Sequence, residues 1–288
     1  MRSASRRRGR SVVVTGAGEG VGRHIALALA AKGYIVFGTA MSAAEAGELK
    51  DASGGRVSLT VCDVTKAAAV EAWACGVTEA LGQGGLDLLI NNAGIRPQGP
   101  IETLQLDDIR RAFECNVFAL IAVTNAFLPA LRAARGRIVQ VGSWMASLPL
   151  PFIGPSAAAH AAMEVFSAVY RAELKAFGID VVVIALGTVS TVASTAAAGL
   201  ARIGGAMTAG QRRLYGKTFS AFVRSSGGLQ AEQIEPAVAA ARVVELAEQR
   251  PAPGRVAVGR HAERILSTVR RSSEAELDAL RLKLAGLS

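Results

Sequence analysis

The sequence predicts an α/β protein, with a doubly wound parallel sheet of about seven strands and helices on both of its faces. Short β-branched runs alternate with longer Ala- and Leu-rich stretches as far as about residue 185. The short runs are almost continuously apolar, which is typical of strands that are covered on both faces. With 288 residues, of which 51% are apolar and 19% charged, the chain can fill one large core, so disorder is excluded for most of it.

Strands are expected where β-branched and other apolar residues run together, at residues 11–15, 35–39, 57–62, 86–90, 137–141, 179–185 and 255–258. Helices are expected in the stretches between them, at residues 21–32, 44–51, 67–81, 106–135, 156–177 and 231–248, and in the tail from residue 261. Residues 188–228, rich in Ala, Thr and Gly, break the alternation. This length predicts short helices with a lid-like role over a ligand site; a poorly ordered loop is the alternative.

The chain is therefore predicted to have three parts. Residues 1–10 are a flexible basic tail, residues 11–260 form one domain that contains the lid-like insertion, and residues 261–288 are a C-terminal helical extension.

The net charge of +9 is concentrated at the N-terminus. Five arginines lie within the first ten residues, which hold no acid: Arg2, Arg6, Arg7, Arg8 and Arg10. A nucleic-acid-binding protein would show a basic stripe along an element or interleaved aromatic residues, and aromatic residues make up only 5% of this chain. We interpret the tail as a solvated segment, with contact to an anionic partner as the alternative.

Three cysteines, Cys62, Cys75 and Cys115, are odd in number and widely spaced, which favours reduced thiols over a disulfide framework or a metal cluster. A cytoplasmic location is expected, because the Arg-rich start is not followed by an apolar segment long enough for a secretory signal. The two long uncharged segments, residues 138–163 and 181–201, are interrupted by Gly, Pro, Ser or Thr. We therefore expect no membrane partner, no nucleic-acid partner and no metal site.

A glycine-rich turn follows the first expected strand and precedes a helix-forming segment, which is the context in which such a turn indicates phosphate binding. Glycines let the backbone approach a pyrophosphate, and the N-terminus of the helix offers unpaired N–H groups. The residues expected to bind the cofactor here are Gly16, Gly18, Glu19, Gly20, Val21 and Gly22.

This turn, with Thr15 before it, resembles that of the short-chain dehydrogenase/reductase family, and further motifs follow in the family's order. Asp63 and Val64 stand where the family places an Asp toward the adenine, and the run from Asn91 to Gly94 is similar to its signature after the fourth strand. The resemblance covers roughly residues 11–260 and implies a Rossmann-like fold that binds NAD(H) or NADP(H). It adds to the expected cofactor site Asp63, Val64, Asn92, Ala93, Gly94, Gly187, Thr188 and Thr191.

The resemblance fails at the two residues on which the family's chemistry depends. The family has Tyr-x-x-x-Lys about a dozen residues after a catalytic Ser, whereas here Ser143 is followed at that distance by Ser156 and His160. Tyr170 lies about 21 Å further along the expected helix and cannot substitute. Ser156 is a poor general acid, because no neighbouring cation can bring the pKa of an aliphatic hydroxyl to neutrality. Loss of a positioned acid or base costs about 10² to 10⁴ in rate, so carbonyl reduction should be slow unless another group supplies the proton.

His160 is the candidate replacement, because positions 156 and 160 share one helix face and an imidazole with a pKa near 6.5 can act as a general acid or base. Contact with the cofactor ribose and no role at all are the alternatives. A nucleophilic pair of Ser156 and His160 is disfavoured, since no acid is seen to orient the histidine. Ser143 and Asn116, which match the family's catalytic Ser and Asn, are expected either to contact substrate or water or to be inherited structure.

An apolar segment follows Ser143 and is expected either to wall a pocket or to join the core; its large members are Trp144, Met145, Leu148, Leu150, Phe152 and Ile153. The cofactor choice is weakly indicated. Residues 39–42, after the second strand, offer neither an acid for a ribose 2′-hydroxyl nor a base for a 2′-phosphate. Glu19 would repel a phosphate, which slightly favours NAD(H), and weak or lost binding is the alternative.

Two classes of function remain open. The first is an enzyme acting on a small, mostly apolar carbonyl or hydroxyl compound. It would perform either slow nicotinamide-dependent redox chemistry, with His160 or water in place of Tyr and Lys, or a redox-neutral cyclisation, isomerisation or elimination. The second is a catalytically inactive subunit or sensor. The resemblance implies pairing through the helices at residues 106–135 and 156–177, and so a homodimer, a homotetramer or an assembly with another family member.

Overall fold

The computed structural model describes residues 9–229 and 232–287, and for residues 191–197 and 227–229 only the backbone. Most of the predicted basic tail, residues 1–8, thus lies outside the described residues. Arg10 leads into the first strand, and its guanidinium lies 4.3 Å from the centre of the Tyr34 ring and 2.6 Å from the Glu248 carboxylate.

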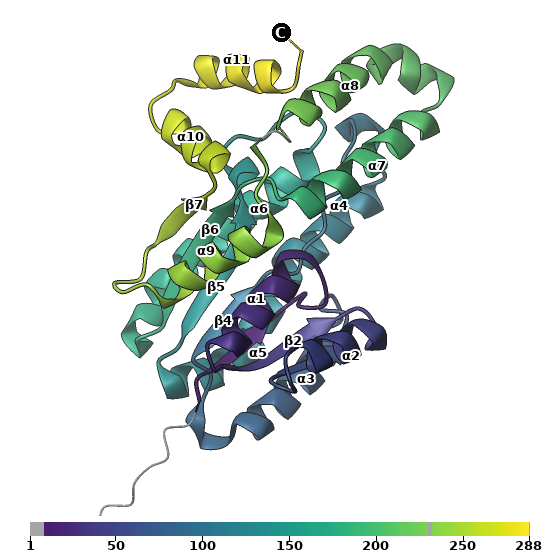
Figure 1. Ribbon diagram of the computed structural model, residues 1–288. Coiled ribbons are helices and arrows are strands. Elements are labelled where there is room, and N and C mark those ends of the chain that lie inside the picture. The colour runs from purple at the N-terminus through teal and green to yellow at the C-terminus, as the bar shows by residue number, and fades with distance from the viewer. Residues whose placement is uncertain (1–8, 230–231, 288) are drawn as a thin grey trace, which may run out of the picture.

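Seven parallel strands form one sheet in the order β3-β2-β1-β4-β5-β6-β7 (Figure 1). The doubly wound parallel sheet predicted from the sequence is confirmed. Its order reverses between β1 and β4, and ligands of open α/β sheets bind outside the carboxyl ends of the strands at such a switch point. The strands are β1 (Ser11–Val14), β2 (Ile35–Ala40), β3 (Val57–Val61), β4 (Leu88–Asn91), β5 (Arg137–Ser143), β6 (Asp180–Leu186) and β7 (Arg255–Val258).

Helices cover both faces of the sheet, because successive side chains of a strand point to opposite faces. Val12 joins a core with Ile25 and Val243 on one face, whereas Val13 joins a core with Trp73 and Phe127 on the other. The first face is covered by α1 (Gly20–Ala31), α2 (Ala43–Ala52) and α9 (Pro236–Glu248). The second is covered by α3 (Ala67–Leu81), α5 (Ala119–Ala134) and α6 (Gly154–Leu174).

The helix expected at residues 106–135 has a π-helical turn within it. It consists of α4 (Leu106–Phe113), the π-helical turn η3 (Glu114–Phe118) and α5. By length and composition alone, this helix of 29 residues is apolar enough to cross a membrane, since an 18-residue window within it has a mean hydropathy of 1.7. Its apolar side is used within the fold, because Val123, Phe127 and Leu131 are buried against the sheet.

The insertion differs from the short helices expected at residues 188–228. It contains two long helices, α7 (Ser190–Ala206) and α8 (Ala209–Leu229), which form an arm beyond the carboxyl ends of the strands (Figure 1). The chain then ends in α10 (Arg260–Val269) and α11 (Glu274–Leu284). Leu200, Phe219, Ile265 and Leu277 from these four helices share one apolar core, which explains why the insertion forms packed helices.

Candidate functional site

The glycine-rich turn between β1 and α1 is held in place by β4. The Thr15 hydroxyl accepts hydrogen bonds from the backbone N–H groups of Asn92 and Ala93 at 2.9 and 3.0 Å, and the Asn92 amide donates to the Gly16 carbonyl at 3.3 Å. A Cβ on Gly22 would lie 2.0 Å from the Gly16 carbonyl oxygen. Only glycine fits there, so α1 starts directly against the turn.

The N-terminus of α1 has no capping side chain. Glu19 is its N-cap residue, yet its carboxylate caps no N–H, and the first backbone bond of this helix runs from Arg23 N to Glu19 O. The N–H groups of Gly20, Val21 and Gly22 therefore have no helical partner, as at any helix start. These donors and the positive end of the helix dipole suit a pyrophosphate.

The carboxyl end of β2 contains a feature that the sequence alone did not indicate. The Thr39 hydroxyl accepts from Gly16 N at 2.9 Å, so it braces the turn. The Glu45 carboxylate, from the first turn of α2, accepts from Met41 N at 3.0 Å. A Cβ on Gly18 would lie 2.0 Å from Glu45 Oε2. An acid therefore lies between the glycine-rich turn and the end of β2, although none follows β2 directly in the sequence.

The other expected cofactor residues also lie at the carboxyl ends of strands. Asp63 is exposed and accepts from the Thr65 hydroxyl at 2.7 Å, which lowers the pKa of its carboxyl, while Val64 is buried. Gly187 N donates to Val258 O at 2.8 Å, and Thr188 O accepts from Ile234 N at 2.9 Å. Thr191 belongs to the first turn of α7, but its side chain lies outside the described residues.

Asn116 lies in the π-helical turn and joins it to the loop after β4. Its side-chain oxygen accepts from Ile95 N and its amide donates to Ile95 O, both at 2.8 Å. The Asn116 side chain also lies close to Gly94, because a Cβ on Gly94 would be 3.0 Å from Asn116 Oδ1. Of the two roles expected for Asn116, the geometry favours the positioning of backbone over direct contact with substrate.

Ser143 ends β5 and is buried; its hydroxyl accepts weakly from Met145 N at 3.3 Å. Ser156 is also buried, and its hydroxyl has no hydrogen-bond partner among the described residues. The apolar segment after Ser143 packs against the α7–α8 arm. The centre of the Phe152 ring lies 5.3 Å from that of Phe219 and 5.2 Å from that of Phe222. Its members therefore contribute to the core.

His160 is buried on α6, against the end of β5. A Cβ on Gly142 would lie 3.9 Å from His160 Cδ2. Its Nδ1 lies 2.7 Å from the Ser156 carbonyl oxygen, so Nδ1 carries the proton and donates, and Nε2 of the neutral ring bears a lone pair. Burial lowers the pKa of His160 to about 4, and the positive charge of Arg96 also lowers it.

The pKa of His160 is thus lower than the value near 6.5 on which the sequence-based prediction rested. At neutral pH the ring is uncharged and has no proton on Nε2 to give, so His160 is a hydrogen-bond acceptor rather than a general acid. The disfavoured nucleophilic pair does not form either, because the imidazole bonds the Ser156 carbonyl and not its hydroxyl.

Arg96 follows the turn after β4 and was not indicated by the sequence analysis. Its side chain is half-buried, and burial lowers its pKa. Two tethers hold its segment: Asn116 binds Ile95, and Gly99 N donates to Phe152 O at 2.7 Å, just before α6. The signal in the sequence was its position directly after the Asn91–Gly94 motif.

All three tyrosines of the chain form hydrogen bonds elsewhere. Tyr34 donates to Glu248 at 3.0 Å, Tyr170 to Asn125 at 2.8 Å, and Tyr215 to Glu102. Tyr215 belongs to α8, so its bond connects the arm to the segment before α4. Within the described ranges, no group of three or more His, Cys, Asp and Glu could hold a metal ion.

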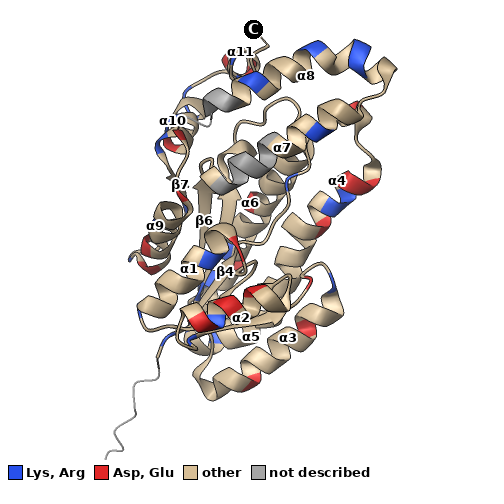
Figure 2. Cartoon of the chain, turned by 45° about the vertical axis from the view of Figure 1, so that its right-hand side comes forward, with Lys and Arg blue, Asp and Glu red and all other residues tan. Residues whose placement is uncertain are grey.

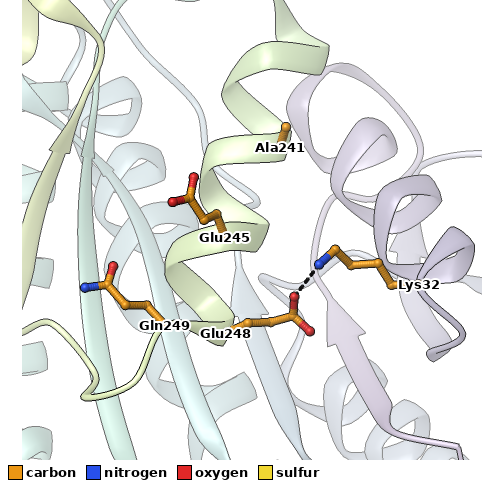
Figure 3. A pocket seen from close by; sticks show the side chains of 5 residues that line it. All are labelled: Lys32, Ala241, Glu245, Glu248 and Gln249. Carbon is orange, nitrogen blue, oxygen red and sulfur yellow. Dashed lines mark hydrogen bonds and ion pairs between the residues drawn. The ribbon is translucent and has the colours of Figure 1, made fainter.

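A surface hollow of about 390 Å³ lies at the far end of α1, near α9 (Figure 3). It is lined by Lys32, Ala241, Glu245, Glu248 and Gln249. Lys32 and Glu248 form an ion pair at 2.5 Å. Because α1 begins at the glycine-rich turn and this hollow lies at its last turn, the hollow is separate from the candidate site.

Comparison with known proteins identifies the family. The profile of short chain dehydrogenases matches residues 10–198. The chain belongs to the short-chain dehydrogenase/reductase family, whose members are NAD(P)-binding oxidoreductases. A solved short-chain dehydrogenase from Streptomyces avermitilis is 27% identical, with a TM-score of 0.76 over 97% of this chain and 96% of that one.

Named relatives act on different molecules. The NADPH-dependent 3-dehydrocapnine reductase of Ornithobacterium rhinotracheale is 31% identical over 63% of this chain and 66% of its own length. Estradiol 17-beta-dehydrogenase 2 of Mus musculus is 36% identical over 63% of this chain and 49% of its own length. The chain thus matches less than two thirds of the length of these relatives.

Proposed function

We propose that this protein is an NAD(H)-preferring oxidoreductase for a small, mostly apolar carbonyl or hydroxyl compound, with water rather than a tyrosine exchanging the proton. The observation that carries this proposal is the pairing of an intact glycine-rich turn with a neutral histidine, His160, at the position of the family's lysine. Both lie at the carboxyl ends of the strands, where the fold binds its ligands.

The residues around the turn fit a dinucleotide. Glycine is required at position 22, the first N–H groups of α1 have no partner, and Thr15 and Asn92 hold the backbone in place. When bound, the cofactor supplies or accepts a hydride. Asp63, with its pKa lowered by Thr65, remains an anion that can accept a hydrogen bond from an adenine amino group.

His160 and Ser143 are the polar side chains proposed to act on substrate. Because Nε2 of His160 carries no proton, it can accept a hydrogen bond from a water molecule or a substrate hydroxyl and so orient that group. Ser143, at the adjacent end of β5, donates to the substrate oxygen. The proton itself comes from water, so a slow reaction is expected in comparison with relatives that use a tyrosine.

Glu45 supports the preference for NAD(H). Its carboxylate lies against Gly18 and bonds Met41 N, in the region where an acid binds the adenosine ribose. Acidic residues coloured red gather on α2, next to the start of α1 (Figure 2). A 2′-phosphate placed there would meet Glu45 and Glu19 as like charges.

The proposal is tested with the purified full chain. NADH and NADPH are titrated by fluorescence, and deuterium-labelled NADH is then incubated with medium-chain aldehydes and ketones while the products are followed by mass spectrometry. Tighter binding of NADH and transfer of deuterium are expected. Failure to bind either dinucleotide would refute the proposal, and binding without deuterium transfer would favour a redox-neutral step or a non-catalytic subunit.

Self-association in the cytoplasm is also part of the proposal. At the end of η3 and on α6, four apolar side chains are 42 to 65% exposed: Phe118, Val165, Phe166 and Val169. A second copy covering them would remove this apolar area from water. We expect Val165→Glu to dissociate the oligomer by light scattering, and Val238→Glu, equally exposed on α9, to leave it unchanged.

A further inference from the structure

Arg96 is a partly buried cation without a hydrogen-bond or ion-pair partner in the described part of the chain. The structure gives its guanidinium neither a hydrogen bond nor an ion pair with any residue in the described ranges, although its side chain is only partly accessible to solvent. A buried charge is costly unless a counter-charge and hydrogen bonds compensate for its lost hydration. The buried cation Arg137 is compensated in this way, since its guanidinium binds Asp180 at 2.8 Å and two backbone carbonyls.

Three acids on neighbouring elements have other partners, and Asp108 and Glu114 form no ion pair with Arg96 in the described part of the chain. Asp63 is bound by Thr65, and Glu102 accepts from Tyr215. Asp107 pairs with Arg110 at 2.8 Å on the surface of α4. No acid in the described part of the chain supplies the counter-charge of Arg96, so its guanidinium is free to pair with an anion that enters the site.

Arg96 is also held at the reaction side of the site. Its neighbour Ile95 is bound on both backbone groups by Asn116, and the loop is tied by Gly99 to Phe152, four residues before Ser156. Its charge lies within electrostatic reach of His160, whose pKa it lowers. The pyrophosphate donors, in contrast, are at the start of α1, on the other side of β4 from β5.

We propose that Arg96 binds the carboxylate of the substrate, so that the substrate is a small apolar acid that also carries the carbonyl or hydroxyl group. The planar guanidinium can donate two parallel hydrogen bonds to a carboxylate. The apolar part of such a substrate would lie toward Phe152 and the α7–α8 arm, where Ile203 approaches Gly99. The proposal rests on the proposed function, since it names the substrate class of the same site.

Pairs of matched ligands test this proposal: acetate with acetamide, hexanoate with hexanamide, and benzoate with benzamide. Calorimetry measures their binding to the full chain with and without NADH. We expect at least one acid to bind the wild type about tenfold or more tightly than its amide. Arg96→Met should remove that preference, Arg96→Lys should keep part of it, and Arg110→Met, which alters an exposed ion pair, should keep all of it.

Two results would overturn the proposal: no acid is preferred by the wild type, or Arg96→Met keeps the preference. If the second result comes with a fall in the NADH affinity of Arg96→Met, the ligand of Arg96 is a cofactor phosphate instead. The fold of the variant is checked through His160, whose pKa in NMR titration should rise when the nearby charge is removed. The acid preference is measured without NADH as well, so failure of the wild type to bind NADH would refute the proposed function separately.

Discussion

The two halves of the candidate site lie along one edge of the same sheet, but they offer a ligand different groups. At the ends of β1 and β4 these are backbone groups: glycines and helix N–H groups, braced by Thr15 and Asn92. At the end of β5 and on α6 they are the buried side chains of Ser143, Ser156 and His160. The first half keeps its family pattern, and the second has lost the Tyr and Lys of the family.

The difference teaches why one half can change while the fold persists. A substitution in the glycine-rich turn collides with backbone, as the 2.0 Å approach at Gly22 shows. On α6, by contrast, Ser156 and His160 stand where the resemblance predicts Tyr and Lys, and the helix runs unbroken from Gly154 to Leu174. The fold thus does not depend on which groups stand at these two positions.

The largest effect is expected from His160. Its pKa is about 4 in the folded protein, against about 6.5 when unfolded, so between these values the unfolded chain binds more protons. Stability should therefore fall as pH drops from 6.5 towards 4, by at most about 3 kcal/mol. Urea unfolding at pH 7, 6 and 5 should show this loss in the wild type and a smaller one in His160→Phe. His24→Gln, on α1, should behave as the wild type, and equal slopes for all three would contradict the burial of a neutral imidazole.

Gly22→Val should disrupt the glycine-rich turn and weaken the binding of NADH. Its Cβ would lie 2.0 Å from the Gly16 carbonyl oxygen and 2.6 Å from the Asn92 amide nitrogen. The turn must shift at a cost of about 2 kcal/mol, and NADH affinity in fluorescence titrations should fall by at least tenfold. The control Gly76→Ala adds a methyl in α3 where nothing lies within 4 Å, and it should bind NADH normally.

Glu45→Arg would sharpen the assignment of the cofactor. Replacing a carboxylate beside Gly18 with a guanidinium should shift the ratio of NADPH to NADH affinity by about tenfold or more toward NADPH. Glu48→Arg, on the same helix but exposed and paired with Arg23, is the matched control. If both variants shift the ratio equally, only the net charge of α2 matters.

Asn116→Ala should have the smallest effect, and it distinguishes positioning from catalysis. The change leaves Ile95 N–H and C=O without their partners, at a cost of about 1 kcal/mol in thermal or urea unfolding. Because Asn116 acts on the loop that carries Arg96, the affinity for acids should fall while NADH affinity is kept. Unchanged acid binding would leave Asn116 with a purely structural role.

Much of the dinucleotide half could be predicted from the sequence. Gly16, Gly20 and Gly22 lie where a strand passes into a helix, and in that context a glycine-rich turn predicts phosphate binding. The long helices of residues 190–229 could not be predicted as such, because their apolar residues are interpretable only with α10 and α11, which supply their core. Glu45 was missed because its carboxylate reaches Gly18, which is 27 residues away in the sequence.

The sequence by itself determined the parallel sheet and the motifs that follow its strands. These are the glycine-rich turn, the Asn91–Gly94 motif and Ser143, which is not followed by the Tyr and Lys of the family. Tertiary structure alone decided the protonation and the partners of these groups. Burial makes His160 a neutral acceptor, Asn116 is occupied by Ile95, and no acid among the described residues pairs with Arg96. The reason is physical: backbone patterns are local and periodic, whereas desolvation and charge pairing depend on which distant residues share a small volume.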